Sequence, residues 1–204
     1  MDENQVKIMP DKGQINKNAS PQEALESAYC IVRVRTGAEF SEVYRRLCAM
    51  RDVVGCDAVH DDYHLVVLMQ ADDAARLQTQ YDAIKTLEDV EEALYLPVVE
   101  SRQNENPALG NARTGTVQPH EKGSFVEGYV LVEAEKEHLS KVYLHCSQLE
   151  GIVTCALVSG AYQLLLRIKQ KNYHRLKKVL TEKIRPMLGL LRARQMVVID
   201  LFRM

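Results

Sequence analysis

The sequence predicts an α+β protein built from two copies of one β-α-β-β-α-β unit. Residues 43–63 (VYRRLCAMRDVVGCDAVHDDY) return about 99 positions later as residues 142–162 (VYLHCSQLEGIVTCALVSGAY). Both segments open on Val-Tyr, contain Val-x-Cys and close on a Tyr that precedes apolar residues. A single repeat of this period indicates a duplicated domain rather than a solenoid, whose units are usually about 20–50 residues long. The offset slips only between 99 and 100, so we expect the insertions to be single residues in loops.

The first copy shows the pattern of four strands and two helices. Runs rich in β-branched residues, separated by turn residues such as Asp61-Asp62, indicate strands, and apolar residues at helical spacing indicate helices. Strands are expected over residues 29–35, 53–60, 63–70 and 90–99. Helices are expected over residues 39–50 and after Asp72 or Asp73, which would cap the second one. Pro97 favours an edge or irregular position in the last strand.

The second copy repeats this pattern after a polar stretch. Strands are expected over residues 127–134, 152–158, 162–168 and 190–202, and helices over residues 138–149 and 172–185. We therefore divide the chain into a tail (1–27), a first domain (28–100), a linker (101–126) and a second domain (127–204). In the second helix of this copy, Tyr173, Leu176, Leu180 and Ile184 are expected to form the buried stripe.

This element order is the ferredoxin-like arrangement, in which two helices cover one face of a four-stranded antiparallel sheet. The strands are too apolar for the other face to be left in water. In a tandem protein the natural cover is the sheet of the other copy, either within one chain or exchanged between chains. We therefore predict two tandem ferredoxin-like domains whose sheets face each other.

Composition excludes some classes of protein. Hydrophobic residues make up 46% and charged residues 26% of the chain, which is ordinary for a globular protein. No apolar run has the roughly 18–20 residues of a membrane helix, and the N-terminus is polar, so we expect a cytoplasmic protein without a membrane partner. Five cysteines without a C-x-x-C pair argue against a disulfide framework. Buried thiols are favoured, with a reactive thiol as the alternative.

The two copies differ in charge. Residues 28–100 hold 7 basic and 14 acidic residues, whereas residues 127–204 hold 13 basic and 7 acidic ones. Ten of the basic residues lie between Arg167 and Arg194, with Glu182 as the single acid there. This stretch favours a solvated face or association with the acidic first copy, and nucleic acid is the alternative.

The turn between the second and third strands of each copy carries the candidate site residues. In the second copy these are Ser159, Gly160, Ala161, Tyr162 and Gln163, whose neutral donors and acceptors could hold the two ends of a zwitterion. In the first copy they are His60, Asp61, Asp62, Tyr63 and His64, which place two imidazoles and two carboxylates within five residues. A metal site or an acid/base pair is conceivable there, but ordinary solvated turns explain both segments, and we assign no metal and no catalytic residue.

Residues 155–166 (CALVSGAYQLLL) resemble the effector-binding domain of the Lrp/AsnC regulators, and the resemblance spans about 127–201. It implies a dimeric α/β barrel made by sheet-to-sheet pairing, with amino acids or other small effectors bound near this turn at subunit boundaries. Two departures are evident. The 27 polar N-terminal residues cannot form the helix-turn-helix of these regulators, and His64 and Gln163 stand where the family tends to have Asp.

These observations favour a non-catalytic module that senses a small molecule, such as an amino acid, and acts through a homo-oligomer or a partner regulator. No cofactor is expected, and direct DNA binding is not expected either. The sequence contains no P-loop, G-x-G-x-x-G, H-E-x-x-H or G-x-S-x-G motif. A small dimeric α/β-barrel enzyme and a peptide-binding, chaperone-like protein are the alternatives.

Overall fold

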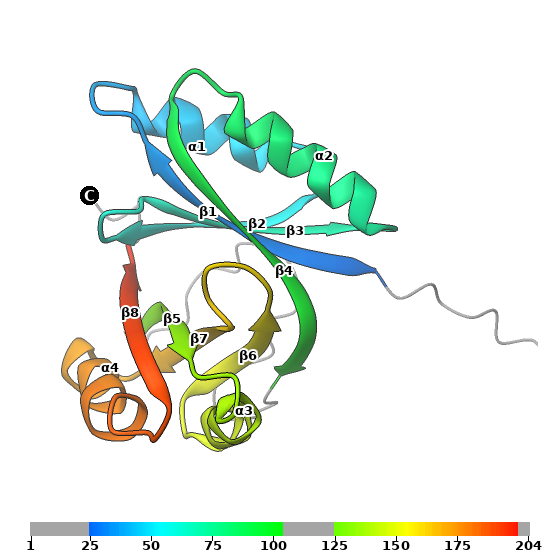
Figure 1. Ribbon diagram of the computed structural model, residues 1–204. Coiled ribbons are helices and arrows are strands. Elements are labelled where there is room, and N and C mark those ends of the chain that lie inside the picture. Colours follow the sequence, from blue (N-terminus) through cyan, green and yellow to red (C-terminus); the bar gives the residue numbers. More distant parts are fainter. Residues whose placement is uncertain (1–24, 104–124, 200–204) are drawn as a thin grey trace, which may run out of the picture.

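The computed structural model describes residues 25–103 and 125–199 and repeats one element order twice (Figure 1). The first half contains β1 (Glu26–Val34), α1 (Phe40–Cys48), β2 (Val53–His60), β3 (Leu65–Ala71), α2 (Ala74–Lys85) and β4 (Val90–Gln103). The second half contains β5 (Val126–Ala134), α3 (Leu139–Gln148), β6 (Ile152–Val158), β7 (Leu164–Gln170), α4 (Tyr173–Lys178), the π-helical segment η2 (Val179–Ile184) and β8 (Leu190–Val198). The predicted α+β class is confirmed, and the division into separate domains stays a prediction.

Two boundaries differ from the sequence analysis. β1 begins at Glu26, inside the expected tail, and β4 continues to Gln103, inside the expected linker. β4 is longer because its second part pairs with β6 after its first part has paired with β1. The rest of the expected tail and linker lies outside the described residues. None of the described helices is long and apolar enough to cross a membrane.

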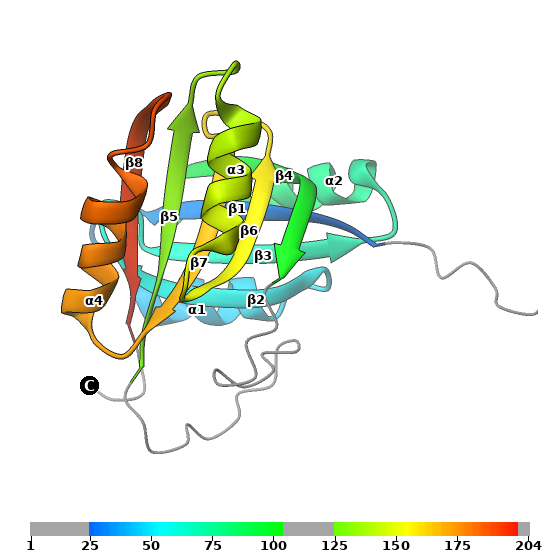
Figure 2. The same ribbon diagram turned by 90° about the horizontal axis from the view of Figure 1, so that it is seen from below.

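The eight strands close into one antiparallel barrel in the order β1-β3-β2-β8-β5-β7-β6-β4 (Figure 2). The β2–β8 and β4–β6 pairs join the two halves. Moving four strands around this order takes every strand to its counterpart in the other half. A two-fold rotation about the barrel axis therefore relates the halves, and equivalent strand ends lie at the same mouth of the barrel.

Apolar side chains fill the space between the two halves. Alternate residues of each strand point to opposite faces, so one set packs under the helices and the other set points into the barrel. The interior set includes Ile31, Leu131, Leu165 and Met196, all of which are fully buried. In Figure 1, α1 and α2 lie on one outer side and α3 and α4 on the opposite side. Each sheet thus covers the inner face of the other.

Pro97 occupies the irregular position that its chemistry favours. It pairs with Ala28 of β1, and the next residue, Val98, begins the pairing with Val158 of β6. The β4–β6 register shifts immediately afterwards, between Val98 and Glu100. A residue without an N–H group therefore lies where β4 passes from one neighbour to the other.

The expectation that every insertion lies in a loop is wrong for the last helix. Leu77 and Ile84, seven residues apart, are the buried residues of α2, whereas their counterparts Leu176 and Ile184 are eight residues apart. The extra residue is absorbed by η2, in which the Arg185 amide donates to the Leu180 carbonyl at 2.9 Å. A single-turn π-helix of this kind is the usual way for a helix to accept one inserted residue without losing its buried face.

The expected buried stripe of this helix also needs one correction. Leu176, Leu180 and Ile184 are buried, but the Tyr173 side chain is 53% exposed. Tyr173 is the first residue of α4 and directly follows the cap, Asn172, whose side-chain oxygen accepts from the Arg175 amide at 2.9 Å. The buried stripe of this helix therefore begins at Leu176.

Candidate functional site

The turns with the predicted site residues lie at the same end of the barrel. Residues 61–64 link β2, which ends at His60, to β3, and residues 159–163 link β6 to β7. These turns are equivalent under the two-fold rotation derived from the strand order. We call the region formed by both turns together with Arg33, Glu92, Glu133, Arg192 and Arg194 the barrel mouth. It contains residues from both halves of the chain.

His64 and Gln163 make the same hydrogen bond at equivalent positions. His64 Nδ1 accepts from the Val34 amide at 2.9 Å, and Gln163 Oε1 accepts from the Ala134 amide at 3.0 Å. These amides are at the ends of β1 and β5. Because His64 accepts through Nδ1, a neutral ring carries its proton on Nε2. The two side chains therefore hold the turns against the neighbouring strands.

The second turn lies against a strand of the first half. The Ser159 amide donates to the Pro97 carbonyl at 3.0 Å. Gly160 has φ = 123°, and a Cβ there would lie 3.1 Å from the Tyr95 carbonyl oxygen. Glycine is therefore required both by the backbone conformation and by the close approach to β4. Ser159, Gly160 and Ala161 are exposed, so their polar atoms are open to solvent beside the contact between the halves.

The first turn is held by an arginine of the second half. Arg194 Nε donates to Asp61 Oδ2 at 2.5 Å, and Arg194 Nη2 donates to Asp62 Oδ2 at 2.7 Å. The Asp61 hydrogen bond is the main cause that raises the pKa of Arg194 above its ordinary value, so this guanidinium stays charged. His60 is exposed. In residues 25–103 and 125–199 no three His, Cys, Asp or Glu side chains gather as a metal-binding group.

The two arginines of β8 lie over tyrosine rings. The Arg194 guanidinium lies 4.7 Å from the centroid of the Tyr63 ring, and the Arg192 guanidinium lies 4.9 Å from that of Tyr162. Both distances are in the range of cation–π contacts. The Tyr63 hydroxyl donates to Glu92 Oε1 at 3.0 Å, and burial, followed by this carboxylate, raises the pKa of Tyr63. Both tyrosine rings are buried, so the mouth has an apolar floor beneath its charges.

The ion pairs at the mouth are exchanged in sign between the halves. Arg33 of β1 pairs with Glu92 of β4, and at the equivalent positions Glu133 of β5 pairs with Arg192 of β8. Both pairs face each other directly in their strand registers. In the first half the arginine is on the first strand and the glutamate on the last, and in the second half the two charges have changed places. A ligand at the mouth would encounter both signs of charge.

Sequence reasoning found the turns but missed the arginines. Arg192 and Arg194 were assigned to a basic stretch that was expected to be a solvated face. Side chains alternate along β8, so Arg192 and Arg194 are on the same face of the strand as Met196, which points into the barrel. The sequence also contains a second indication. Arg33 and Glu92 correspond, 100 positions later, to Glu133 and Arg192, so the two charges are swapped between the copies.

At the opposite end of the barrel, two more residues of the basic stretch, Arg167 and Lys169, pair with one carboxylate. Arg167 Nη2 donates to Glu127 Oε2 at 2.8 Å, and Lys169 Nζ lies 3.5 Å from the other oxygen of this carboxylate. Nearby, the Tyr129 hydroxyl donates to Asp57 of the first half. The outward basic residues that remain are on or beside α4 and η2: Lys171, Arg175, Lys177, Lys178, Lys183 and Arg185.

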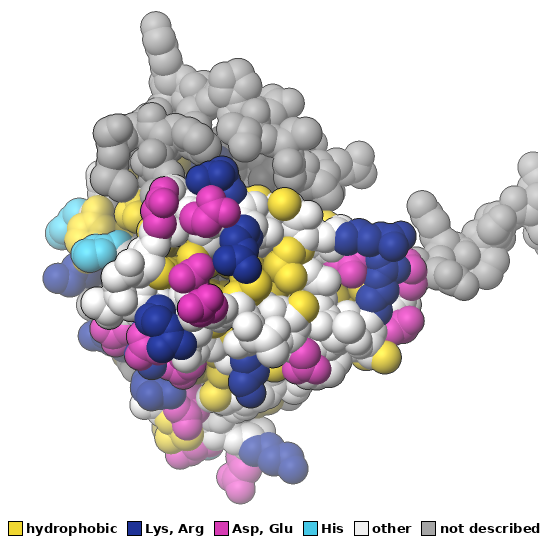
Figure 3. Space-filling model, turned by 90° about the horizontal axis from the view of Figure 1, so that it is seen from above, with side chains coloured by type: hydrophobic (Ala, Val, Ile, Leu, Met, Phe, Trp, Pro, Cys, Tyr) yellow, Lys and Arg dark blue, Asp and Glu magenta, His cyan; other side chains and the backbone are white. Residues whose placement is uncertain are grey.

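The outer face of the first half has no field of a single sign. Figure 3 views the molecule from the side of α1 and α2, and acidic and basic side chains are interspersed there. Several of them pair, including Arg46 with Asp89 at 3.3 Å and Arg76 with Asp52 at 2.5 Å. On this face, therefore, the acidic side chains do not form one continuous surface.

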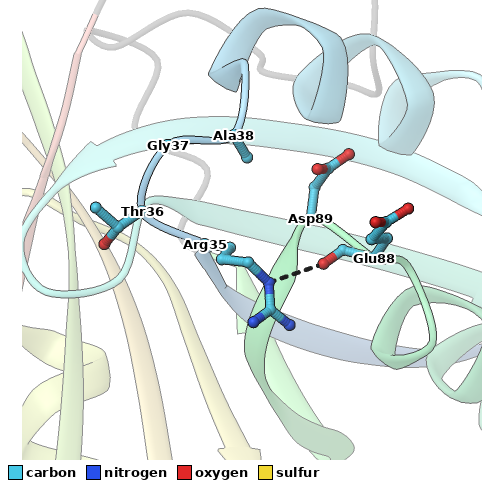
Figure 4. Close-up of a pocket in the computed structure, with 6 residues that line it drawn as sticks. All are labelled: Arg35, Thr36, Gly37, Ala38, Glu88 and Asp89. Atoms are coloured by element: carbon cyan, nitrogen blue, oxygen red, sulfur yellow. Dashed lines mark hydrogen bonds between the residues drawn. The ribbon is translucent and has the colours of Figure 1, made fainter.

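A surface recess of about 560 Å³ lies outside the barrel mouth (Figure 4). It is lined by the loop before α1 and the loop before β4: Arg35, Thr36, Gly37, Ala38, Glu88 and Asp89. Arg35 Nε donates to the Glu88 carbonyl at 3.0 Å, which ties the two loops together. None of the predicted site residues lines this recess, so it is separate from the turns.

Comparison with known proteins supports the resemblance in the second half. Residues 127–203 match the family model of the Lrp/AsnC ligand binding domain. The match covers both the second turn and β8, and thus Tyr162, Gln163, Arg192 and Arg194. No curated protein matches the sequence significantly.

Solved structures share the fold at low sequence identity. The siroheme decarboxylase NirDL is 11% identical over 86% of this chain and 72% of its own, with a TM-score of 0.59. An anthrone oxidase-like protein is 7% identical over 88% of this chain and 93% of its own, with a TM-score of 0.55. AsnC of E. coli is 14% identical over 46% of this chain and 64% of its own, with a TM-score of 0.38. At these identities the likeness to the first two structures, whose TM-scores exceed 0.5, establishes the α+β fold alone.

The equivalent roles of His64 and Gln163 generate one prediction. His64→Gln should keep the free energy of unfolding within about 1 kcal/mol of the wild type, because a glutamine oxygen already accepts the equivalent amide in the second half. His64→Ala should lower it by about 1–3 kcal/mol, because the Val34 amide loses its acceptor. Urea denaturation measures both values. Equal losses in the two variants would contradict the assigned role.

The two arginines of β8 give a second prediction. Arg194→Met should lower the free energy of unfolding by about 1–3 kcal/mol, because both turn carboxylates lose a charged donor. Arg192→Met is the matched control: its side chain is 57% exposed and has one carboxylate partner, so the loss should not exceed about 1 kcal/mol. If chemical denaturation gives the same loss for both, Arg194 does not hold the first turn.

Proposed function

We propose that this chain is a non-catalytic sensing module whose small-molecule effector binds at the barrel mouth, because residues 127–203 match the family model of the Lrp/AsnC ligand binding domain. The observation that carries this proposal is the position of Arg194. From the second half it reaches the carboxylates of Asp61 and Asp62 and the ring of Tyr63 in the first half. A ligand at this guanidinium therefore touches both halves at once.

The chemistry of the mouth fits a small molecule with a carboxylate and a cationic group, such as an amino acid. A carboxylate would replace the aspartates as the partner of Arg194, since a guanidinium binds carboxylates through parallel donors. Glu92 and Glu133 offer acceptors for an ammonium group, and the rings of Tyr63 and Tyr162 offer apolar surface. The open polar atoms of Ser159 and Gly160 lie on the adjoining turn.

Replacement of the aspartates by a ligand carboxylate would also change how the first turn is held. When Arg194 turns to the effector, Asp61 and Asp62 lose the donor that holds the first turn, and this turn becomes free to move. A ligand shifts such an equilibrium only by its differential affinity for the two arrangements. The difference here is the exchange of one carboxylate partner for another. The released turn would then alter contacts with another copy of the chain or with a partner regulator.

In this proposal the two halves are tandem domains that act as the two subunits of a dimeric α/β barrel. The pairing of β2 with β8 and of β4 with β6 supports this arrangement, because each pair joins the two halves of a single chain. Fusion also allows the two halves to diverge, as the exchanged ion pairs of the mouth illustrate. A symmetric dimer of identical subunits would present the same charge at both positions.

The described interior favours sensing over catalysis. Aliphatic and tyrosine side chains fill the barrel between the sheets, whereas an enzyme of this architecture needs room for substrate beside a base or a nucleophile. Of the two imidazoles at the barrel mouth, His64 accepts the Val34 amide through Nδ1 and His60 is exposed. We therefore propose a binding role rather than the enzyme or the peptide-binding alternative.

A thermal-stability screen with the proteinogenic amino acids tests this proposal. A compound at about one hundred times its Kd should stabilise the native chain by about 2.7 kcal/mol and raise Tm by about 5–10 °C. Arg194→Met should abolish this shift, because it removes the charged donor at the mouth. Arg45→Met is the control, since Arg45 is an exposed residue of α1 that pairs with Glu42, and it should leave the shift unchanged.

Two results would contradict the proposal. One is a panel in which no amino acid changes Tm. The other is a stabilising amino acid whose shift survives Arg194→Met, because its site would then lie outside the mouth. Small-molecule carboxylates without an amino group, used as a parallel panel, show whether the cationic group is needed.

A further inference from the structure

The helices that cover the second half form a surface that is almost entirely basic. Figure 2 shows α3 and α4 together on this side of the barrel, and η2 continues α4. We call the exposed side chains of residues 139–148 and 171–189 the basic face. Glu182 is the single acid in these two described ranges, and it lies 3.6 Å from Lys178 Nζ. The basic residues are all exposed: Lys141, Lys171, Arg175, Lys177, Lys178, Lys183 and Arg185.

The fold itself does not require this charge, as the equivalent helix of the first half shows. Residues 72–85 hold three acids and two bases, a net charge of −1, whereas residues 171–185 hold six bases and one acid, a net charge of +5. Arg76 of the first half also pairs with Asp52 and Asp72, at 2.5 and 3.0 Å. Crowded charges of one sign repel each other and destabilise the compact chain. Packing therefore gives no reason for the basic face.

Three large apolar side chains are exposed on the same face. Leu188 is 79% exposed, Tyr173 53% and Leu144 47%. Tyr173 begins α4 and Leu188 follows η2, so these two residues lie at the two ends of the basic helix, and Leu144 lies on α3. The second half thus combines exposed cations with exposed apolar groups. The first half has other residues at the equivalent positions, namely Glu88, Ala74 and Arg45.

This combination of side chains restricts the kind of partner. A second copy of the basic face does not fit, because two like-charged surfaces repel, and the outer face of the first half presents both signs of charge (Figure 3). The phosphate backbone of a nucleic acid would match the cations but would offer no apolar contact to Leu144 and Leu188. An anionic lipid bilayer offers both, since its phosphates lie directly above acyl chains. Clusters of about four to eight Lys or Arg on an amphipathic helix are typical of binding to anionic lipids.

We propose that the basic face binds the surface of an anionic lipid bilayer. The Lys and Arg side chains of α4 and η2 contact the headgroup phosphates, and Leu188 enters the boundary between headgroups and acyl chains. The expectation of a chain without a membrane partner rests on the lack of an apolar spanning segment, and a surface contact needs none. No residue of the barrel mouth belongs to the basic face, so the contact is independent of the effector proposed there.

Sedimentation of the native full chain with lipid vesicles tests this contact. The chain should bind vesicles of phosphatidylcholine mixed with phosphatidylglycerol, and it should not bind vesicles of phosphatidylcholine alone. Added salt should weaken the binding, because it screens exposed charges. Equal binding to both kinds of vesicle, or binding to neither, would overturn the proposal.

A triple variant, Arg175→Gln with Lys177→Gln and Lys183→Gln, tests the cations of the basic face. Its partition coefficient onto the mixed vesicles should fall about one hundredfold, because each Lys or Arg near an anionic surface contributes roughly a factor of five. All three side chains are exposed, so the variant should fold, which an unchanged Tm would verify.

The matched control removes the same charge from the first half. It combines Arg45→Gln, Arg51→Gln and Lys85→Gln, at three exposed positions outside the basic face, and it should bind the mixed vesicles as the wild type does. If both triple variants lose binding equally, the net charge of the chain and not the basic face drives it, and the proposal fails.

Leu188→Ser tests the apolar part of the contact. It should weaken binding to the mixed vesicles about tenfold, because a leucine side chain no longer leaves water. Leu25→Ser is the control, since Leu25 is 55% exposed at the start of the first half, and it should have no effect. A double-stranded oligonucleotide in place of the vesicles tests the other partner. If the chain binds the oligonucleotide but not the vesicles, and Leu188→Ser binds it equally well, the basic face contacts nucleic acid and the proposal is wrong.

Discussion

The need to cover the inner face of each sheet determines most of this structure. Two helices cover only one face of a four-stranded sheet. Without the other sheet, residues on the second face such as Ile31 and Leu131 would be exposed to water. Burying apolar surface contributes roughly 25 cal/mol for each Å², so two such faces bind strongly to each other. Closing the barrel also leaves both halves joined by strand pairs, β2 to β8 and β4 to β6. The shared interior, the two-fold relation and the barrel mouth all follow from this contact.

Duplication made the fold predictable, and divergence between the copies made the site difficult to predict. The repeat predicted the element order and the turns, because apolar spacing is a local property of the sequence. It did not predict the π-helical η2, since the buried positions Leu176 and Ile184 had to be compared with Leu77 and Ile84 before the inserted residue could be located. The ends of the first and fourth strands were also set by pairing with distant strands, which local patterns do not contain.

The candidate site shows the same division. The two turns were found from their polar residues, but the roles of those residues depend on partners far along the chain. His64 was considered for metal or acid/base chemistry, yet its ring nitrogen is the acceptor for a backbone amide, as Gln163 is in the other half. Arg194, 133 residues from Asp61, was grouped with a surface stretch because neighbouring residues in sequence are basic. Only closure of the barrel brings it to the first turn.

The account depends most on the two halves forming one folded unit around a common interior. Native-state hydrogen exchange on the full chain measures this directly, through the opening free energies of buried strand amides such as Val66 in β3 and Leu165 in β7. Amides in both halves should exchange through the same global opening, with free energies that agree and that fall together in denaturant. If the amides of one half exchanged at a much lower free energy while the other half stayed protected, the halves would not depend on each other, and a site built from both would lose its basis.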